Sequence, residues 1–475
     1  MRIRRVGYVP VPHFDTFTPL DDLDGVGHIP GLVPDPLFPE MEYLAGPWET
    51  NAFWVTVQAP VDAAPGRYPV SVTLTSDAGE SVTLTATVRV HRAVLPARRD
   101  FPVTHWFYAD ALCDWYKVKI TEDAFWKILL PYLDNVVAHG QDTLYVPMFT
   151  PPLDGVKTPT QLLHVSRSGD RYHFDWSLVR RWVHTALDRG ITRFEWTHLF
   201  TQWGVKYAIR IYENHGVKER LLWDPETGAT SPTYRHFLAQ FLPEFERFLR
   251  TEGLMERSFF HLSDEPHGEE HLANYRAARE LLRELAPWMQ VMDALSQISF
   301  AEEGLTDIPI PVTETAVEFL KRGIPAWVYY CCWPRGRYMN RLLDTPLVKV
   351  AMSGWLCYRL RAHGFLQWGY NYWYKSQTRE LIDPFTVTDG LKWGKGWAYG
   401  DPFVVYPGPD GPIDSLRWEV FAESLQDYAL LQAAGIDPDD PLLADITDFA
   451  DFPRDERWIT QRRRAIFKLL ERVKQ

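Results

Sequence analysis

Apolar and polar residues alternate along the first part of the chain. In "GRYPVSVTLTSDAGESVTLTATVRV" the β-branched residues recur at every second position, and "SDAG" is a hairpin turn signal. Val70, Val72 and Leu74 would face one side of the first of these two strands. We predict that residues 1–98 form an N-terminal β-sandwich with a structural role.

From residue 101 onward, short apolar runs alternate with amphipathic helical patterns, which indicates β/α units and a parallel sheet. The candidate strands are 101–108, 142–149, 192–200, 258–264, 290–295, 308–314, 326–332 and 364–373. Eight strands interleaved with helices are typical of a (β/α)8, TIM-like barrel, which we expect over residues 99–385. A doubly wound open sheet is the alternative. Neither a dinucleotide-binding fingerprint nor a P-loop motif occurs, so a nucleotide site is not indicated.

The last part of the chain combines turn residues with helical patterns. "YPGPDGP" is followed by "WEVFAESLQDYALLQAAG" and "ERWITQRRRAIFKLLERV". We expect residues 386–475 to form a short closing segment that packs on the barrel. The predicted fold class is therefore a multidomain β plus α/β protein.

Composition narrows the range of partners. Lys and Arg number 50 and Asp and Glu number 62, so the formal net charge of −12 argues against nucleic acid and anionic membranes. Aromatic residues make up 14% of the chain, and their flat faces suit sugar rings. The four cysteines are too few for a disulfide framework and lack metal-ligand spacing. No cofactor is expected, and a homo-oligomer stays open.

The N-terminus "MRIRRVGYVPVPHFDT" has neither the apolar core nor the cleavage site of a secretory leader. No apolar run is long enough for a transmembrane helix. We therefore expect a cytoplasmic protein without a membrane partner. A secreted protein whose leader has been removed would look the same.

Aromatic and polar residues gather at the carboxyl ends of the candidate strands, where a barrel holds its active site. They are Trp106, Phe107, Tyr108, Glu195, Trp196, His198, His261, Asp264, Glu265, Asp293, Glu314, Tyr329, Tyr330, Gln367, Trp368, Tyr370, Asn371 and Trp373. A single aromatic residue in such a position is more often part of the core. Their convergence from several strands indicates a carbohydrate site, in which rings stack on the sugar and polar groups bond its hydroxyls.

The fourth candidate strand ends in "FFHLSDEPHGEEH", where Asp264 and Glu265 are adjacent. Ser263 or Asp264 could be the N-cap of a following helix, with the acids near its positive end. Alternatively, the two carboxylates act together. Most glycosidases hold their two carboxylates on separate elements, so adjacent acids suit the substrate-assisted exception, in which the sugar's own 2-acetamido oxygen is the nucleophile.

That scheme assigns different roles to the two acids. Asp264 stays ionised to stabilise an oxazolinium ring, and Glu265 protonates the leaving oxygen with a raised pKa. Consecutive side chains of a strand point to opposite faces, so the scheme needs a bend, which Pro266 would favour.

Several segments, in order, resemble glycoside hydrolase family 123 and its DUF4091-type relatives. They are "FFHLSDEP", "AWVYYCCWP" and "GFLQWGYNYW", together with the N-terminal "RVGYVPVP" region and the late "YPGPDGPIDSLRWEVFAESLQDYALL". The resemblance implies a retaining exo-acting β-N-acetylgalactosaminidase that uses substrate assistance. Its partner would be a glycan or glycoconjugate with a terminal β-linked N-acetylgalactosamine.

By this resemblance, Asp264 stabilises the acetamido group and Glu265 is the general acid/base. The sugar contacts that it implies are His198, Tyr329, Tyr330, Trp368, Tyr370 and Asn371.

Other functions stay open. A glycosidase with separated carboxylates would pair Glu265 with Glu195, Asp293 or Glu314. A β-N-acetylglucosaminidase differs only at C4 of the sugar, a preference that the residues do not specify. A non-catalytic glycan-binding protein is a further alternative. A metal hydrolase with His198, His261 and His267 as ligands has no supporting motif.

Overall fold

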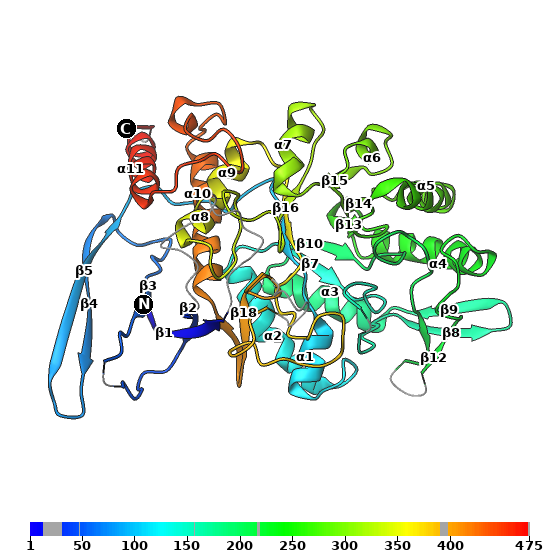
Figure 1. Ribbon diagram of the computed structural model, residues 1–475, viewed down its shortest axis with the longest axis horizontal. Helices are drawn as coiled ribbons and strands as arrows, with labels where there is room; N and C mark the ends of the chain where they lie inside the picture. Colours follow the sequence, from blue (N-terminus) through cyan, green and yellow to red (C-terminus); the bar gives the residue numbers. More distant parts are fainter. Residues whose placement is uncertain (13–30, 47, 156, 216–218, 390–397, 474–475) are drawn as a thin grey trace.

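The computed structural model describes residues 1–12, 31–46, 48–155, 157–215, 219–389 and 398–473. Its centre holds eight short strands, one inside each of the predicted strand segments (Figure 1). They are β6 (Val103–His105), β7 (Thr143–Val146), β10 (Arg193–Trp196), β13 (Ser258–Phe260), β14 (Met292–Ala294), β15 (Ile308–Ile310), β16 (Val328–Tyr329) and β17 (Phe365–Gln367). Their residues are mostly buried, as expected for parallel strands covered on both faces.

Hydrogen bonds connect neighbouring strands in the order of the chain. β7, β10 and β13 form one parallel sheet, β16, β17 and β6 a second, and β14 and β15 a third. Parallel bridges link Phe260 to Val291, between β13 and β14, and Val312 to Tyr329, between β15 and β16. Next to β7, the N–H of Asp142 donates to the carbonyl of Val103 in β6 at 3.4 Å.

Helices lie outside these strands (Figure 1). They are α1 (Ala109–Tyr116), α2 (Asp123–Ala138), α3 (Ser177–Arg189), α4 (Pro232–Thr251), α5 (Gly268–Leu285), α6 (Ser299–Glu302), α7 (Thr313–Lys321), α8 (Leu347–Ala351) and α9 (Ser353–Arg359). Among the described residues, no helix is both long and apolar enough to cross a membrane.

The sequence of α4 explains both its start and its packing. Ser231 caps the helix by accepting a hydrogen bond from the N–H of Tyr234. Phe237, Phe241 and Phe245 are spaced by four residues, so their rings form a stacked row with centroids 5.7 and 5.4 Å apart. All three rings are buried, which anchors the helix to the core.

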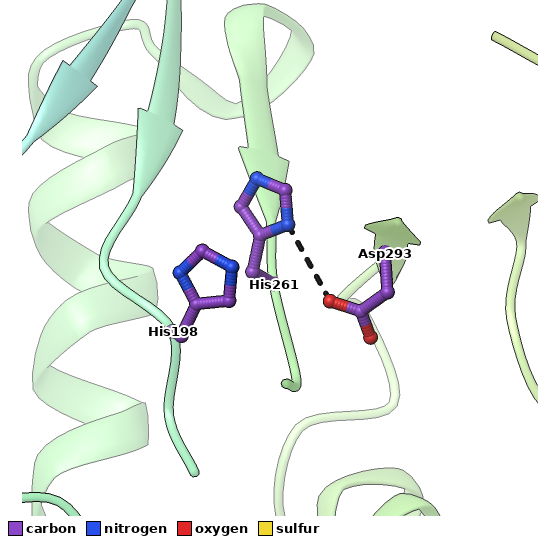
Figure 2. A group of neighbouring side chains, drawn as sticks. All are labelled: His198, His261 and Asp293. Atoms are coloured by element: carbon purple, nitrogen blue, oxygen red, sulfur yellow. Dashed lines mark ion pairs between the residues drawn. The ribbon is translucent and has the colours of Figure 1, made fainter. Parts of the chain in front are cut away.

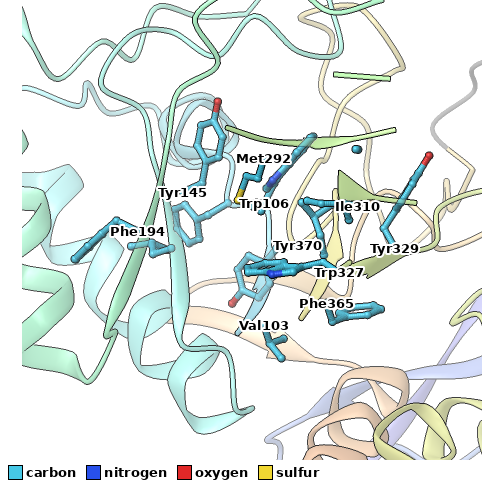
Figure 3. Close-up of a cluster of buried hydrophobic side chains, with 14 of the residues drawn as sticks. Val103, Trp106, Tyr145, Phe194, Met292, Ile310, Trp327, Tyr329, Phe365 and Tyr370 are labelled. Atoms are coloured by element: carbon cyan, nitrogen blue, oxygen red, sulfur yellow. The ribbon is translucent and has the colours of Figure 1, made fainter. Parts of the chain in front are cut away.

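Apolar side chains from different strands form one buried core (Figure 3). Val103, Phe194, Met292, Ile310 and Phe365 come from β6, β10, β14, β15 and β17, and all are completely buried. The strands therefore share a single hydrophobic interior that fixes their mutual positions.

The N-terminal region consists, in its described residues, of two separate sheets. β1 (Arg2–Val11) pairs with β2 (Gly31–Phe38) and β3 (Phe53–Thr56), whereas β4 (Gly66–Thr75) and β5 (Ser81–Val90) form a two-stranded ribbon. The predicted hairpin is confirmed, but Val82 and Leu84 are each 61% exposed. The alternating pattern of these residues predicts the two strands, but these apolar side chains are not covered. The described residues of β4 and β5 therefore do not show a packed sandwich.

The long segments after β7 and β10 pair with each other. β8 (His164–Ser168), β9 (Arg171–Asp175), β11 (Tyr212–Glu213) and β12 (Arg220–Leu221) form a four-stranded sheet. This sheet lies beside the central strands, at the right of Figure 1.

The C-terminal part contributes a hairpin, β18 (Val405–Gly408) and β19 (Gly411–Asp414), and the helices α10 (Leu416–Ala433) and α11 (Glu456–Val473). α10 crosses α9 closely because Gly354 has no side chain: a Cβ there would lie 1.8 Å from the carbonyl oxygen of Ser424. Arg463 of α11 donates two hydrogen bonds to Asp427 of α10, at 2.6 and 2.8 Å. This part of the chain is therefore packed against the helices around the strands.

A buried cluster of charges attaches β1 to the C-terminal part. Arg4, whose side chain is 3% exposed, pairs with Asp414 and lies 2.6 Å from Glu419. Arg2 reaches the same two acids at 3.5 and 3.0 Å, but its side chain is 56% exposed.

We expect Arg4→Ala to lower the free energy of unfolding by about 3–5 kcal/mol, because it removes the buried guanidinium from two buried carboxylates and leaves only His139, at 3.7 and 3.4 Å, as a buried basic partner. Arg2→Ala is the matched control, since an exposed ion pair contributes about 0–1 kcal/mol. Urea denaturation followed by circular dichroism measures both variants. Equal losses would contradict the assignment of the attachment to the buried pair.

Candidate active site

Hydrogen bonds hold the exit of β13 on two sides. Oδ1 of Asp293, in β14, accepts the backbone N–H groups of Leu262 and Ser263 at 3.1 and 3.2 Å. The Ser263 hydroxyl donates to the carbonyl of Thr201, after β10, at 2.7 Å. These bonds position the next two residues of the chain, which are the adjacent acids.

Glu265 has a left-handed backbone conformation with φ of +47°. A residue in this conformation breaks the alternation of a strand, so the adjacent acids need not point to opposite faces. A bend at this point is one condition of the substrate-assisted scheme, and the joint action of the two acids stays a prediction. The N-cap of α5 is His267, so the interpretation of Ser263 or Asp264 as a helix cap is wrong.

Asp264 is buried and lies near other acids. Its Oδ2 accepts a hydrogen bond of 2.7 Å from Gln202, whose Oε1 accepts the N–H of Asp154 at 2.9 Å. Burial raises the pKa of Asp264 well above its ordinary value, and the charges of Glu265 and Asp154 raise it further. Burial and the neighbouring acids therefore oppose the ionised form of Asp264, and the hydrogen bond from Gln202 offsets this in part. A cationic or N–H-bearing ligand would favour the charged form further.

Two aromatic donors hold the carboxylate of Glu265. The Tyr329 hydroxyl donates to Oε1 at 3.0 Å, and the Trp203 indole N–H donates to Oε2 at 3.3 Å. Burial raises the pKa of Tyr329 well above its ordinary value, and the charge of Glu265 adds to this, so the phenol keeps its proton. Glu265 is thus fixed between the segment after β10 and the end of β16.

Three residues before Asp264, a histidine joins two buried carboxylates. His261 Nε2 lies 3.0 Å from Glu195, and its Nδ1 lies 3.4 Å from Asp293. Burial by itself would lower the pKa of His261, but the interactions with Asp293 and Glu195 raise it to about 9. His261 is therefore an imidazolium ion at neutral pH. Since Glu195 and Asp293 are paired with this cation, neither suits the role of a second catalytic carboxylate beside Glu265.

His198, His261 and Asp293 bring possible metal-ligand atoms within 4.8 Å of one another (Figure 2). The two imidazole rings are stacked, with centroids 4.2 Å apart and an interplanar angle of 16°. A zinc ion would lie in the plane of each ring, about 2.0–2.1 Å from the nitrogen. Two nearly parallel rings have no point close to their nitrogens that lies in both ring planes. The arrangement therefore favours the neutral imidazole of His198 stacked on the imidazolium of His261. Burial lowers the pKa of His198 well below its ordinary value, and the charge of His261 lowers it further.

Two of the predicted sugar contacts differ from the rest: Tyr329 is buried but contacts the acid pair, and Trp368 is partly exposed. Tyr329 meets Glu265, as described above. Trp368 is partly exposed, and its indole N–H donates to Asp401 at 3.0 Å. Its ring lies against that of Tyr372, 5.3 Å between centroids, which fixes its orientation.

The other predicted contacts are completely buried: His198, Tyr330, Tyr370 and Asn371. The side-chain amide of Asn371 makes two hydrogen bonds to the backbone of Tyr108: its Oδ1 accepts from the N–H at 2.8 Å, and its Nδ2 donates to the carbonyl at 3.1 Å. The Tyr370 hydroxyl donates to Asn135 at 2.9 Å, and Tyr330 packs edge-on against Phe365. His198 Nδ1 lies 3.0 Å from the Tyr145 hydroxyl. These side chains build the surroundings of the site, and their direct contact with a sugar stays a prediction.

Three residues around the acid pair were not predicted: Asp154, Gln202 and Trp203. Gln202 and Trp203 stand in "TQWG", directly after the predicted strand "TRFEWTHLF". Extending the search for polar side chains from the strand ends into the next few residues would have found both. Asp154 lies in the long segment after β7, where no local pattern marks it.

Comparison with known proteins identifies the family of this mixed α/β chain. The model of the glycoside hydrolase 123 catalytic domain matches residues 106–434, which is more than half of the chain. The protein is therefore a glycoside hydrolase. More particularly, the chain belongs to glycoside hydrolase family 123. No curated protein matches it.

Among solved structures, a family 123 glycoside hydrolase from Clostridium perfringens is similar, with a TM-score of 0.74 and 15% identity, covering 98% of this chain and 84% of that protein. At this identity the likeness shows a shared fold. The exo-β-1,4-mannosidase Op5Man5 from Opitutaceae bacterium strain TAV5 has a TM-score of 0.39 and 12% identity, covering 76% of this chain and 61% of that one. This second similarity is too weak to support an argument.

We expect Asp293→Ala to lower the free energy of unfolding by roughly 3–5 kcal/mol, because His261 loses one carboxylate and two backbone N–H groups lose their acceptor. Tyr275→Phe is the matched control, since it removes only a hydroxyl that donates to Asp293 at 2.5 Å. That hydrogen bond should contribute about 1.5–3 kcal/mol. Urea denaturation measures both variants, and a smaller loss in Asp293→Ala than in Tyr275→Phe would contradict the role given to Asp293.

Proposed function

We propose that this family 123 glycoside hydrolase is a retaining exo-β-N-acetylgalactosaminidase that works by substrate-assisted catalysis through an oxazolinium intermediate. The observation that carries the proposal is the adjacent pair Asp264 and Glu265, with a left-handed backbone at Glu265. Pairing Glu265 with Glu195 or Asp293 is disfavoured because both carboxylates are paired with His261. Glu314, the third alternative, is an exposed residue in the first turn of α7.

In the first step the acetamido oxygen of the substrate attacks the anomeric carbon, while Glu265 donates its proton to the leaving oxygen. Asp264 accepts the acetamido N–H, and its negative charge stabilises the cyclic oxazolinium ion. In the second step Glu265 takes a proton from water, and this water opens the oxazolinium ring from the opposite face. Two inversions at the anomeric carbon give overall retention.

The surroundings of the two acids suit these roles. Tyr329 and Trp203 donate to the two oxygens of Glu265, which holds this carboxyl group in one orientation for proton transfer. The positive charge of the oxazolinium ion would lower the raised pKa of Asp264, so that the aspartate becomes ionised when its charge is needed.

The order of strand neighbours from β6 to β17 supports a (β/α)8 barrel around this site. In such a barrel the catalytic groups stand at the carboxyl ends of the strands. Asp264 and Glu265 follow β13, and Tyr329 ends β16, which agrees with this placement.

The proposed substrate is a glycan with a terminal β-linked N-acetylgalactosamine. The relative from Clostridium perfringens is described in terms of glycolipid glycan hydrolysis. We extend that class of substrate to this chain, with Tyr329 and the partly exposed Trp368 as walls of the sugar site.

The wild-type protein should release N-acetylgalactosamine from an aryl β-N-acetylgalactosaminide, and a thiazoline mimic of the oxazoline should inhibit it. Glu265→Gln and Asp264→Asn should each lower kcat/KM by about 10²–10⁴, because each removes a charge or proton that the transition state needs. Glu269→Gln, an exposed acid in the first turn of α5, is the matched control and should retain activity.

Two results would contradict this scheme. Full activity in Asp264→Asn would show that the aspartate does not serve the acetamido group. Equal cleavage of the aryl β-galactoside, which lacks the acetamido group, would exclude substrate assistance. The aryl β-N-acetylglucosaminide, compared under the same conditions, reports the preference at C4.

Activity should also depend on pH through Asp264. Because burial raises the pKa of this carboxyl, kcat/KM should rise as pH increases through that pKa and Asp264 becomes ionised. The residual activity of Asp264→Asn should lack this acidic limb, which a pH profile of kcat/KM measures. An unchanged limb in the variant would assign the titration to another group.

A further inference from the structure

Trp203 is an exposed aromatic residue in contact with the proposed general acid. It lies in the segment after β10, and 41% of its surface is exposed. Its indole N–H donates to Glu265 Oε2 at 3.3 Å. Because Glu265 must protonate the oxygen that joins the terminal sugar to the leaving group, a ring that touches Glu265 and faces solvent lies beside that leaving group.

The backbone of Trp203 is fixed in a strained conformation. Its φ is +53°, in the left-handed region that a bulky residue rarely adopts. Its N–H donates to the carbonyl of Asp264 at 3.0 Å. The carbonyl of the next residue, Gly204, accepts a hydrogen bond of 2.9 Å from the side chain of Asn274 in α5. The indole is therefore presented in one orientation relative to the acid pair.

Another indole, Trp333 in the segment after β16, is equally exposed. It donates its N–H to Glu314 at 2.9 Å, in the first turn of α7, and so is attached to a neighbouring element. The direct contact with Glu265 favours Trp203 as the ring next to the scissile bond.

We propose that Trp203 is the platform for the first sugar of the leaving group, a pyranose that lays its C–H face on the exposed indole. This inference rests on the proposed function, in which Glu265 is the acid. An indole offers a large apolar face with negative charge density, and the C–H groups of a pyranose carry partial positive charge. The hydroxyls at the edge of the ring stay hydrated, so an exposed platform suits this ligand.

The test compares two substrates that share the same terminal sugar. These are β-N-acetylgalactosaminyl-(1→3)-galactose and methyl β-N-acetylgalactosaminide, whose leaving group has no ring. Trp203→Ala should lower the ratio of kcat/KM for the disaccharide to kcat/KM for the methyl glycoside by about three- to tenfold, the range for one aromatic stack. Trp203→Phe keeps a ring without the N–H, so any loss should affect both substrates alike and leave the ratio nearly unchanged.

The fully exposed Trp48, between β2 and β3, provides the control Trp48→Ala, whose ratio should equal that of the wild type. A loss of equal size for both substrates in Trp203→Ala would overturn the proposal, since Trp203 would then only position Glu265. Circular dichroism of each variant verifies the fold.

If the wild type cleaves neither substrate, the proposed function is contradicted. The role of Trp203 as a sugar platform is then tested by measuring ligand binding. Calorimetric titration with methyl β-galactoside, a pyranose probe with an apolar C–H face, should give weaker binding to Trp203→Ala than to wild type and retained binding to Trp203→Phe. Equal binding to all three proteins would overturn the inference, whatever the terminal sugar is.

Discussion

The imidazolium of His261, between Glu195 and Asp293, is the interaction on which the site depends. It joins β10, β13 and β14 through one buried cation. The same Asp293 carboxylate accepts two backbone N–H groups just before the acid pair. A buried charge without a partner is strongly destabilising, so these three groups are stable only together. The geometry of the acids is therefore coupled to the stability of the strands that carry them.

The sequence predicts those parts that local patterns govern. Buried parallel strands need apolar residues on both faces, so continuous apolar runs mark their positions along the chain. Helices α2, α4 and α5 coincide with amphipathic patterns for a similar reason, since one face must meet the core. Asp264 and Glu265 stand out as two adjacent charges at the end of an apolar run, but this pattern fits a helix start equally well, and the resemblance to family 123 is what distinguishes the two interpretations.

Contacts between distant segments are not visible in those patterns. Trp203 and Tyr329 meet at Glu265 only because their strands are brought together by the fold. Tyr370 and Asn371 have residue types that suit a sugar, but both are used within the protein, and only the fold reveals this. Likewise, the alternating pattern of β4 and β5 predicts that both segments are strands, but it does not predict whether other parts of the protein cover them. The pKa of Asp264 depends on burial and on Asp154, which lies 110 residues earlier in the chain.

The left-handed backbone of Glu265 has a consequence for how such a chain can evolve. Glycine would adopt this conformation without steric strain, and asparagine with little, so the backbone alone disfavours glutamate here by about 1 kcal/mol. Glycine would also remove the acceptor of the Tyr329 and Trp203 hydrogen bonds, and a buried hydroxyl without an acceptor costs about 1–3 kcal/mol. The carboxylate thus offsets the strain of its own backbone, and a chain that exchanged it for glycine would lose the acid without becoming more stable.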